Sequence, residues 1–524
     1  MNNDKKNEIT NPLEDIEQKT PNSLEDIEQK TPNSLDDIEQ KTPGDIEQEI
    51  TNSLGDIENS AVDKLLAKQA KKNAKRAQKK AAKNGTSAVA TDDPVKLAAK
   101  QVELEERVRS LVNQLAIREA LASSSSTNTE KDSGVHKFWS TQPVIQNDDV
   151  VEKDGPIEPN TPHDEIRKEP YGLPKEFEWS TMELNNPEEL TEIYTLLTNN
   201  YVEDDDAMFR FDYSEKFLKW ALQPPGYKKV WHVGVRVAST KKLVAFISGI
   251  PADIRIYESR QHLVEINFLC VHKKLRNKRL APVLIKEITR RSHLEGIFQA
   301  VYTAGVVLPK PISRARYYHR SLNPKKLIDT NFSRLPNNMT LTRMIKKYKV
   351  PEETSTAGLR PMKSKDVPKV RVLLNEYMSK FNFVPIFKND EEIRHWILPK
   401  EGVVWSYVVE APGKHITDFF SFYSLPSTVI GHPVHKAIDA VYLFYYATNQ
   451  KEHAVKERLQ QLMKDALILA KLQKIDVFNC LDLMENTLFL DELKFGPGDG
   501  YLNYYMFNWR CKDMESSKVG VVML

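Results

Sequence analysis

Alternating apolar and polar positions extend from about residue 136 to the end of the chain and predict a mixed α/β fold. Strands are predicted where short apolar runs rich in β-branched and aromatic residues lie between turn residues. They cover residues 231–237, 243–250, 263–271, 299–304, 403–410, 418–424, 437–446, 477–480 and 501–509. Helices are predicted over residues 187–200, 214–222, 282–293, 366–380 and 453–472.

The order of these elements indicates two related halves. A helix, several strands, a second helix and a further strand follow one another before residue 350, and a similar series comes after it. We therefore expect two α/β units, residues 136–350 and 351–524. All seven tryptophans lie after residue 136, and the roughly 390 residues of this region are enough to bury a large core.

The first 135 residues show no such pattern. Residues 1–60 repeat an 11-residue unit with a proline at its junctions, and they contain 16 acids against five lysines. They predict a disordered, solvated extension, with a docking tail as the alternative. Residues 61–135 contain a basic segment, an amphipathic helix and a serine-rich linker. The basic segment, residues 64–83, has nine cations and no acid, which favours either ribosomal RNA or another polyanion as a partner, or a solvated charge run.

Composition narrows the class of protein further. The 75 Lys and Arg nearly balance the 73 Asp and Glu, which argues against a protein that mainly coats nucleic acid. The three cysteines, Cys270, Cys480 and Cys511, form no CxxC pair, and the histidines show no ligand spacing, so no metal site is expected. No uncharged apolar run approaches the length of a membrane span, and the first 30 residues are polar. A cytoplasmic monomer without a transmembrane segment is the expectation.

The strongest candidate site is a basic turn between a predicted strand and a predicted helix. Five cations and no acid lie in this turn: Lys273, Lys274, Arg276, Lys278 and Arg279. They adjoin a helix N-terminus, whose free N–H groups favour anions. Phosphate binding is predicted, with a solvated basic loop as the alternative. The turn contains no glycine, so it is neither a P-loop nor a dinucleotide-binding turn.

Several motifs, in the same order along the chain, resemble the N-myristoyltransferase (glycylpeptide N-tetradecanoyltransferase) family of the N-acetyltransferase (GNAT) superfamily. They are Phe138–Trp139 with Thr141–Pro143, the stretch 265–291, Tyr302–Gly305 and Lys494–Tyr501. The apolar C-terminal leucine adds to the resemblance, which covers about residues 136–524. One departure is Asn277, where the family typically has serine.

The resemblance implies a fold of two fused GNAT-like halves around a saddle-shaped mixed sheet. The first half would hold the acyl-coenzyme A, and the second would complete a peptide groove. The substrates would be myristoyl-CoA and a protein whose N-terminal residue is glycine, with no metal or resident cofactor. Because the glycine amine attacks the thioester directly, no catalytic Ser or Cys is required.

The resemblance also implies roles for individual residues. The backbone N–H groups of Phe268 and Leu269 would form an oxyanion hole, and the α-carboxylate of Leu524 would act as the base. Asn267 and Thr303 would lie beside the amine. The acyl-CoA would contact His136, Lys137, Phe138, Trp139, Phe268, Leu269, Cys270, Val271, Arg276, Asn277, Lys278, Arg279, Leu280 and Ala281. From the residues alone, the uncharged tail 519–524 is interpreted as a buried edge strand. In the same way, Phe268, Leu269 and Val271 are interpreted as ordinary core residues of a strand.

The peptide groove would contain acids and aromatic residues. They are Asp204, Asp206, Phe209, Phe211, Tyr213, Tyr317, His319 and Asp499. The acids suit substrates with basic residues, whereas the alternating aromatics are equally typical of one strand face in a core. Two rival functions stay open at this point: an acetyltransferase that uses acetyl-CoA, and a non-catalytic adaptor that binds ribosomes through residues 64–83.

Overall fold

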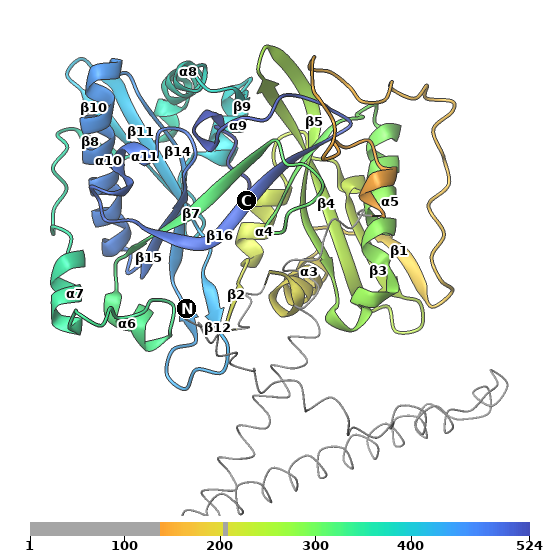
Figure 1. Cartoon of the computed structure of the whole chain (residues 1–524), viewed down its shortest axis with the longest axis horizontal. Helices are drawn as coiled ribbons and strands as arrows, with labels where there is room; N and C mark the ends of the chain where they lie inside the picture. The colour runs from red at the N-terminus through yellow and green to blue at the C-terminus, as the bar shows by residue number, and fades with distance from the viewer. Residues whose placement is uncertain (1–136, 203–207) are drawn as a thin grey trace, which may run out of the picture. The chain divides into compact units, whose positions relative to one another are not determined.

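The computed structural model describes residues 137–202 and 208–524, and it is shown in Figure 1. Several predictions lie outside these residues: the acidic repeats, the basic segment with its helix and linker, and the three site residues His136, Asp204 and Asp206. The division into units at residues 350 and 351 also stays a prediction.

Thirteen strands form one mixed sheet. All but one of them follow each other as a continuous series of hydrogen-bonded neighbours, and the remaining strand pairs with a member of that series. Across the sheet the path runs β1 (Phe177–Thr181), β3 (His232–Val237), β4 (Leu243–Ile256), β5 (Ser259–Val271), β6 (Ala300–Ala304), β16 (Gly496–Phe507), β7 (Ser313–Ser321), β15 (Val477–Leu481), β14 (Ala440–Thr448), β11 (His415–Ser424), β10 (Val404–Ala411) and β8 (Leu359–Pro361). The remaining strand, β9 (Phe383–Pro385), pairs with β4.

The sheet has the same arrangement when followed from either end. β5 and β6 are parallel neighbours joined through α5 (Leu280–Leu294), and β14 and β15 are parallel neighbours joined through α10 (Glu452–Leu472). The middle of the sheet consists of β16 beside β6 and β7 beside β15, and these two central strands pair with each other. The predicted mixed α/β fold with two related halves is confirmed by this order.

Equivalent helices cover the two halves. In the first half α3 (Pro187–Asn200) packs on β4 and β5, and α5 packs on β3, β4 and β5. In the second half α8 (Val367–Met378) packs on β11 and β14, and α10 packs on β14. The start of α3 follows from its sequence, since the Asn186 side chain accepts the N–H of Glu188 and Pro187 needs no hydrogen bond at that position.

Smaller elements complete the molecule. Among the described residues, a second sheet has the strand order β13 (Ala437–Ile438), β12 (Ser427–Val429) and β2 (Phe209–Phe211). The other helices are α4 (Glu215–Leu222), α6 (Pro324–Asp329), α7 (Leu341–Tyr348), α9 (Asp390–Trp396) and α11 (Thr487–Leu490). Buried side chains from both halves form one large apolar core.

Several predicted boundaries were wrong. The predicted strand 243–250 continues to Ile256, and the predicted strand 263–271 begins at Ser259. α5 begins at Leu280 rather than Pro282, because a proline is tolerated anywhere in the first helical turn, where N–H groups have no helical partner. The predicted strand 437–446 is interrupted at Asp439, whose N–H donates to the Asp476 carboxylate at 2.9 Å. β16 begins at Gly496 rather than residue 501, because its glycines allow close contact with β7. A side-chain carbon at Gly498 would lie only 2.4 Å from His319 Nε2.

The strand β7 was not predicted, although it lies in the centre of the sheet. Its sequence is rich in arginine, which does not indicate a buried strand. Two of these arginine side chains donate hydrogen bonds to backbone carbonyl groups. Arg316 Nε donates to the Gly498 carbonyl at 2.8 Å, and Arg320 Nε donates to the Leu493 carbonyl at 2.5 Å. A charged side chain can lie in a sheet when backbone oxygens accept its hydrogen bonds.

The C-terminal tail enters the interior instead of ending at the surface. Gly520 N–H donates to the Phe383 carbonyl at 2.7 Å, and Val522 N–H donates to the Tyr445 hydroxyl at 3.2 Å. Val521 is buried, and its carbonyl accepts the Tyr504 hydroxyl at 3.0 Å. Figure 1 marks the chain end in the middle of the picture, between the strands of the two halves. The predicted inward course of the tail is present.

Candidate active site

A cavity of about 540 Å³ lies between β5, β6, α5 and the C-terminal tail. Its volume is in the range of small-molecule sites. Along α5 the wall carries the apolar residues Ile285 and Ile288 and the uncharged hydroxyls of Thr289 and Ser292, and it continues to Phe298. His293 is also on this wall, and burial lowers the pKa of its imidazole to about 4, so this side chain stays neutral at pH 7. This part of the cavity suits an uncharged chain.

β5 contains a bulge where it borders the cavity. Phe246 pairs with Cys270 and Ser248 pairs with Asn267, so two residues of β5, Phe268 and Leu269, face the single residue Ile247 of β4. Phe268 adopts a left-handed backbone conformation with φ of 56°, which bends the strand. Phe268 and Leu269 both line the cavity.

A bulge leaves backbone groups without a partner in the ladder, and this makes them available to other acceptors. Tyr201 lies against the bulge, with its ring 5.8 Å from that of Phe268. Burial raises the pKa of the Tyr201 hydroxyl, and a hydrogen bond from the Phe268 backbone opposes this rise. The Phe268 backbone therefore interacts with the Tyr201 hydroxyl, outside the regular ladder between β4 and β5.

The chain end meets the bulge in the same cavity. Leu524 lines this cavity together with Asn267 of β5 and Thr303 of β6. Asn267 is held in place at both ends, since its Nδ2 donates to Glu265 Oε1 at 2.8 Å and its carbonyl accepts the Ser248 hydroxyl at 2.8 Å. Leu524, the amide of Asn267 and the hydroxyl of Thr303 thus lie on the wall of the same cavity.

The basic turn forms a short 3-10 helix, η5 (Lys273–Lys278), between β5 and α5. Asn200 at the end of α3 supports this turn. Its side-chain oxygen accepts the Lys273 N–H at 3.0 Å, and its carbonyl accepts Arg276 Nη2 at 2.7 Å. Arg279 is left-handed with φ of 55°, and α5 then begins without a side-chain cap. Exposed cations beside an uncapped helix N-terminus are an arrangement that suits phosphate groups.

An aromatic stack borders the cavity. Trp139 lies on Tyr302 with a centroid distance of 5.4 Å, and Tyr302 lies on Tyr505 at 5.2 Å. Trp139 and Tyr302 line the cavity, and Phe138 packs against Trp139. Lys137 is exposed. Of the predicted covering segment, Trp139 thus lines the cavity, and Phe138 packs behind it on Trp139.

The predicted peptide residues divide into two groups. Phe211, Tyr213 and Tyr317 line the cavity, and burial raises the pKa of Tyr317 to about 12, so its hydroxyl stays a neutral hydrogen-bonding group. His319 lies beyond the wall, where its Nδ1 is 2.7 Å from Asn479 Oδ1. Asp499 is exposed and raises the pKa of His319, against the lowering caused by burial. Phe209 packs on Phe332, with centroids 5.6 Å apart.

Two predicted acyl-CoA residues have side chains in the core rather than at the cavity. Cys270 and Leu280 are buried, and burial raises the pKa of the Cys270 thiol to about 12. Cys270 therefore behaves as a small apolar residue rather than as a nucleophile. Val271, Asn277, Lys278 and Ala281 are not part of the cavity wall either. They belong to β5, η5 and the first turn of α5.

Sequence reasoning missed several groups around the chain end. Tyr445 and Tyr504 hold the tail, and Glu265 holds Asn267. Only Glu265 gave a signal that could have been used, because it is the single charged residue within a predicted strand that is apolar apart from Glu265 and Asn267. In the part of the chain that the structure describes, no cluster of three or more His, Cys, Asp or Glu is placed to hold a metal ion. Within the same residues, no helix is long and apolar enough to cross a membrane.

Comparison with known proteins gives a consistent result. The profile of the N-terminal domain of myristoyl-CoA:protein N-myristoyltransferase matches residues 156–315, and that of the C-terminal domain matches residues 329–522. Glycylpeptide N-tetradecanoyltransferase 2 of Danio rerio is 58% identical over 388 residues, 74% of this chain and 77% of the relative. The glycylpeptide N-tetradecanoyltransferase of Schizosaccharomyces pombe is 52% identical over 419 residues, 77% of this chain and 90% of the relative.

A solved structure agrees with these sequences. The crystal structure of Saccharomyces cerevisiae N-myristoyltransferase with bound myristoyl-CoA superposes with a TM-score of 0.72 at 48% identity, covering 75% of this chain and all of that chain. Fold, site and relatives define this protein as an acyltransferase. Within that class, the chain belongs to the myristoyl-CoA:protein N-myristoyltransferase family. The resemblance found in the sequence is thereby confirmed.

Proposed function

We propose that this chain transfers the myristoyl group of myristoyl-CoA to the N-terminal glycine amine of proteins. Its family supports this activity, and the yeast relative holds myristoyl-CoA in its crystal structure. One observation carries the mechanism: the bulge at Phe268 and Leu269 and the C-terminal Leu524 line the same cavity. A carbonyl group at the bulge and an amine at the chain end would therefore meet in one space.

The coenzyme extends from the cavity to the basic turn in this proposal. The β5 strand and α5 helix that flank η5 both line the cavity, so an acyl chain along α5 leaves the phosphates beside the cations. Arg276 and Lys278 contribute charge, and the first N–H groups of α5 contribute donors. Each buried methylene contributes about 0.8 kcal/mol, so the apolar side chains of the cavity, among them Ile266, Ile285 and Ile288, favour a long acyl chain over acetyl.

The amine binds at the chain end. An α-amine has a pKa of about 7.7 to 8, so roughly one tenth of it is neutral at pH 7 and releasing its proton costs only about 1 kcal/mol. The Leu524 carboxylate therefore needs to hold the ammonium, orient it and accept a proton, rather than act as a strong base. Asn267 and Thr303 direct the amine toward the thioester. The C–N bond forms, the C–S bond breaks, and coenzyme A leaves as the thiol.

The bulge stabilises the charge that develops on the thioester oxygen. A strand with regular pairing has no free N–H group to offer, whereas the bulge presents Phe268 and Leu269 in a fixed orientation. Such donors are effective because they are already oriented before the reaction begins. Removing one donor of this kind from an enzyme costs about 10²- to 10³-fold in kcat.

Transfer to short peptides tests the proposed activity. The full chain should acylate a peptide that begins with glycine when it is given myristoyl-CoA, and it should give little product with acetyl-CoA or with the same peptide beginning with alanine. Mass spectrometry of the peptide identifies the acyl group and its position. Equal rates with acetyl-CoA and myristoyl-CoA would favour the short-chain acetyltransferase, and no transfer from either would favour the non-catalytic adaptor.

Shortening the chain by one residue tests the base. Deleting Leu524 moves the terminal carboxylate back by about 3.5 Å, out of reach of the amine. We expect kcat to fall about 10²- to 10⁴-fold, as for the loss of a general base, while myristoyl-CoA still binds. The matched control is Leu524→Met, which keeps both the carboxylate and the apolar side chain and should retain kcat within a few-fold. Full activity after the deletion would remove the terminal carboxylate from the mechanism.

A further inference from the structure

Leu524 is part of the wall of a second cavity as well as the first. This second cavity has a volume of about 270 Å³, and Glu265, Tyr445 and Val522 lie on its wall with Leu524. At about 30 Å³ for each water in the liquid, such a space has room for roughly nine water molecules. The chain end thus separates the main cavity, where acyl transfer is proposed, from a smaller space whose wall is more polar than that of the main cavity.

Glu265 is the acid that connects the two spaces. It lies on β5 two residues before Asn267, so that both side chains are on the same face of the strand. Asn267 lines the main cavity and Glu265 lines the second, and Asn267 Nδ2 donates to Glu265 Oε1 at 2.8 Å. The accessible surface of Glu265 faces the second cavity, because the residue lies deep within the protein.

Charged residues line the second cavity farther from Glu265. Asp253 accepts contacts from His262 Nδ1 at 3.0 Å and from Lys388 Nζ at 2.5 Å. The side chains of His262 and Lys388 are about half exposed, with 50% and 55% of their surface accessible to solvent. Asp253, His262 and Glu392 are all on the cavity wall. The second cavity therefore extends from the chain end to polar side chains that reach solvent.

The chemistry of the reaction leaves one proton to be removed. A glycine ammonium and a thioester give an amide, a thiol and one H⁺. The glycine nitrogen loses two protons during the reaction. One of them protonates the coenzyme A sulfur, and the other must be released to solvent. The acyl chain and the peptide would fill the main cavity during the reaction, so the extra proton cannot leave on that side.

We propose that Glu265 accepts this proton from the Leu524 carboxyl group and releases it to solvent through the second cavity. The inference rests on the proposed function. Glu265 does not touch the substrates in this account, and it acts through the terminal carboxylate. The terminal carboxylate is thereby returned to its ionised form before the next glycine amine binds.

The electrostatics of Glu265 agree with this role. Burial raises its pKa from 4.5 to about 7, and the hydrogen bond from Asn267 opposes the rise. A group that titrates near 7 can both take up and release a proton under neutral conditions. Other titratable and charged groups surround Glu265. The hydroxyl of Tyr504 is close enough for Glu265 to raise its pKa. The wall of the second cavity adds Tyr445, the Leu524 carboxylate, Asp253, His262, Glu392 and Lys228.

The variant Glu265→Gln tests the inference because glutamine keeps the oxygen that accepts from Asn267 but cannot take up a proton. We expect kcat for myristoyl transfer at pH 7.5 to fall at least tenfold, with KM for both substrates within about twofold of the unaltered enzyme. The pH profile provides the second readout. The unaltered enzyme should lose kcat as the pH falls through about 7, because Glu265 must be ionised to accept the proton, and the variant should lack this step. Added formate, which fits the second cavity, should restore part of the rate.

A purely structural role for Glu265 gives a different result. A variant with kcat within twofold of the unaltered enzyme between pH 6 and 8.5 would overturn the inference. So would a slow variant that keeps the pH step and does not respond to formate. The matched control is Glu392→Gln on the wall of the same cavity, which should keep both the rate and the pH step.

A second variant covers the case in which Glu265→Gln does not fold. Ala252 lines the second cavity on β4, and Ala252→Leu narrows this space without changing Glu265. We expect a lower kcat with unchanged binding of myristoyl-CoA, and an unchanged kcat would again contradict the inference. Failure of the proposed function itself would be distinguishable, since the unaltered chain would then show no myristoyl transfer at all.

Discussion

The two halves of the sheet contain bulges at equivalent positions, but the bulges differ in their surroundings. In the first half Ile247 of β4 faces Phe268 and Leu269 of β5. In the second half Ser421 of β11 faces Phe444 and Tyr445 of β14. The Ser421 hydroxyl accepts the Tyr445 N–H at 3.1 Å and donates to the Tyr445 carbonyl at 2.8 Å. The second bulge is therefore closed by a side chain, although Phe444 and Tyr445 border the second cavity, whereas the first has an apolar residue opposite it and borders the main cavity.

The residues that precede the bulges differ in the same way. Counted from the bulge, Asn267 of the first half corresponds to Leu443 of the second, and Glu265 corresponds to Val441. The second half thus has buried apolar side chains where the first half has an amide and an acid. One fold supports both versions, so the chemistry depends on a few side chains around the bulge rather than on the strand arrangement.

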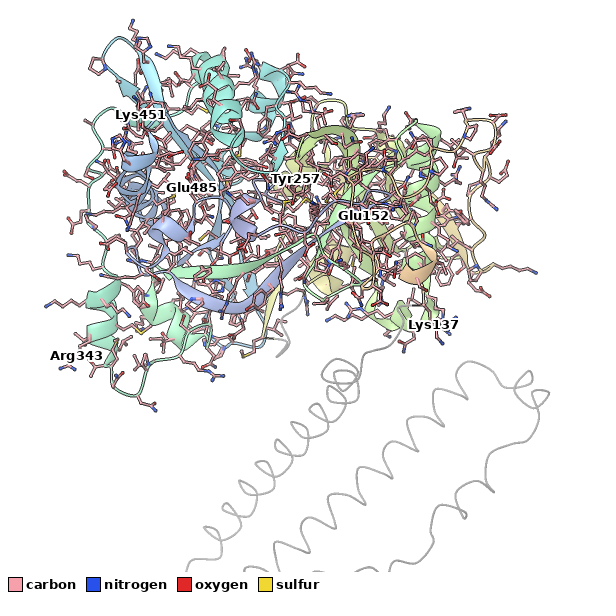
Figure 2. All side chains as sticks on the ribbon, turned by 45° about the horizontal axis from the view of Figure 1, so that its top comes forward. Lys137, Glu152, Tyr257, Arg343, Lys451 and Glu485 are labelled. Carbon is pink, nitrogen blue, oxygen red and sulfur yellow. The ribbon has the colours of Figure 1, made fainter. Side chains whose placement is uncertain are left out.

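The turns after the bulges also differ. In the first half the turn from β5 to α5 carries the exposed cations of η5. In the second half the short turn from β14 to α10 carries Lys451, the residue before the helix. Figure 2 shows Lys451 and Lys137 on opposite sides of the described part of the molecule. Within residues 137–202 and 208–524, the first half thus combines an open bulge with a cationic helix start, and the second half does not.

The largest effect on activity should come from closing the first bulge with a serine hydroxyl, as Ser421 closes the second bulge. Ile247→Ser places a hydroxyl opposite Leu269, where it can accept the N–H that the proposed mechanism uses. We expect kcat for myristoyl transfer to fall about 10²- to 10³-fold, or about 3 to 4 kcal/mol. The matched control is Ile247→Ala, which creates a similar void without a hydroxyl. Equal kcat values for the serine and alanine variants would show that the N–H groups are not required.

The second effect concerns stability in the first half. The free energy of unfolding should rise in Glu265→Gln at pH 8, because Glu265 must ionise inside the protein at that pH. With a pKa raised from 4.5 to about 7, ionisation of Glu265 costs about 3 kcal/mol of stability above pH 7. The cost is absent below pH 4.5 and grows as the pH rises toward 7. Denaturant unfolding at pH 5.5 and pH 8 should therefore show a gain in the variant that is larger at pH 8, and an equal gain at both would contradict the burial of this acid.

The third prediction concerns the hydroxyl that closes the bulge of the second half. Ser421→Ala removes the hydroxyl that closes the second bulge and leaves the buried Tyr445 N–H without this partner. We expect a loss of about 1 to 3 kcal/mol in the free energy of unfolding and no change in kcat. A loss of activity as large as that expected for Ile247→Ser would mean that the second bulge takes part in catalysis.

The smallest effect should come from single cations of the turns. Lys278→Ala should raise the Kd for myristoyl-CoA about three- to tenfold, and the difference should shrink at high salt because exposed charges are screened. Lys451→Ala is the control from the second half and should leave the Kd unchanged. Calorimetric titration at two salt concentrations measures both, and equal effects of the two variants would place the coenzyme elsewhere.

Much of the fold follows from local patterns in the sequence. The predicted strand 263–271 and helix 187–200 depend on apolar spacing and on Asn186 and Pro187, and both elements are present. The strand β7 could not be predicted, because its arginines are satisfied by partners far away in the chain. One of them, Arg314, lies 3.8 Å above the ring of Tyr501. Such partners exist only after the two halves have come together.

The site could be predicted only in part for the same reason. The basic turn and the uncharged tail are local features, and the sequence resemblance implies an oxyanion hole at Phe268 and Leu269. Nothing local indicates that Ile247 faces this bulge, that Ser421 closes the other, or that Glu265 and Leu524 share a second cavity. These relations depend on strand register and on the course of the C-terminal tail.

The most direct test of the account is to observe the backbone N–H groups of both bulges when the ligand binds. A myristoyl-CoA analogue with a methylene in place of the thioester sulfur keeps the carbonyl but cannot react. In protein labelled with ¹⁵N at Phe, Leu and Tyr, the amide proton signals of Phe268 and Leu269 should move strongly downfield as they donate to this carbonyl, while those of Phe444 and Tyr445 stay in place. Unchanged signals at Phe268 and Leu269 in the saturated complex would contradict the account.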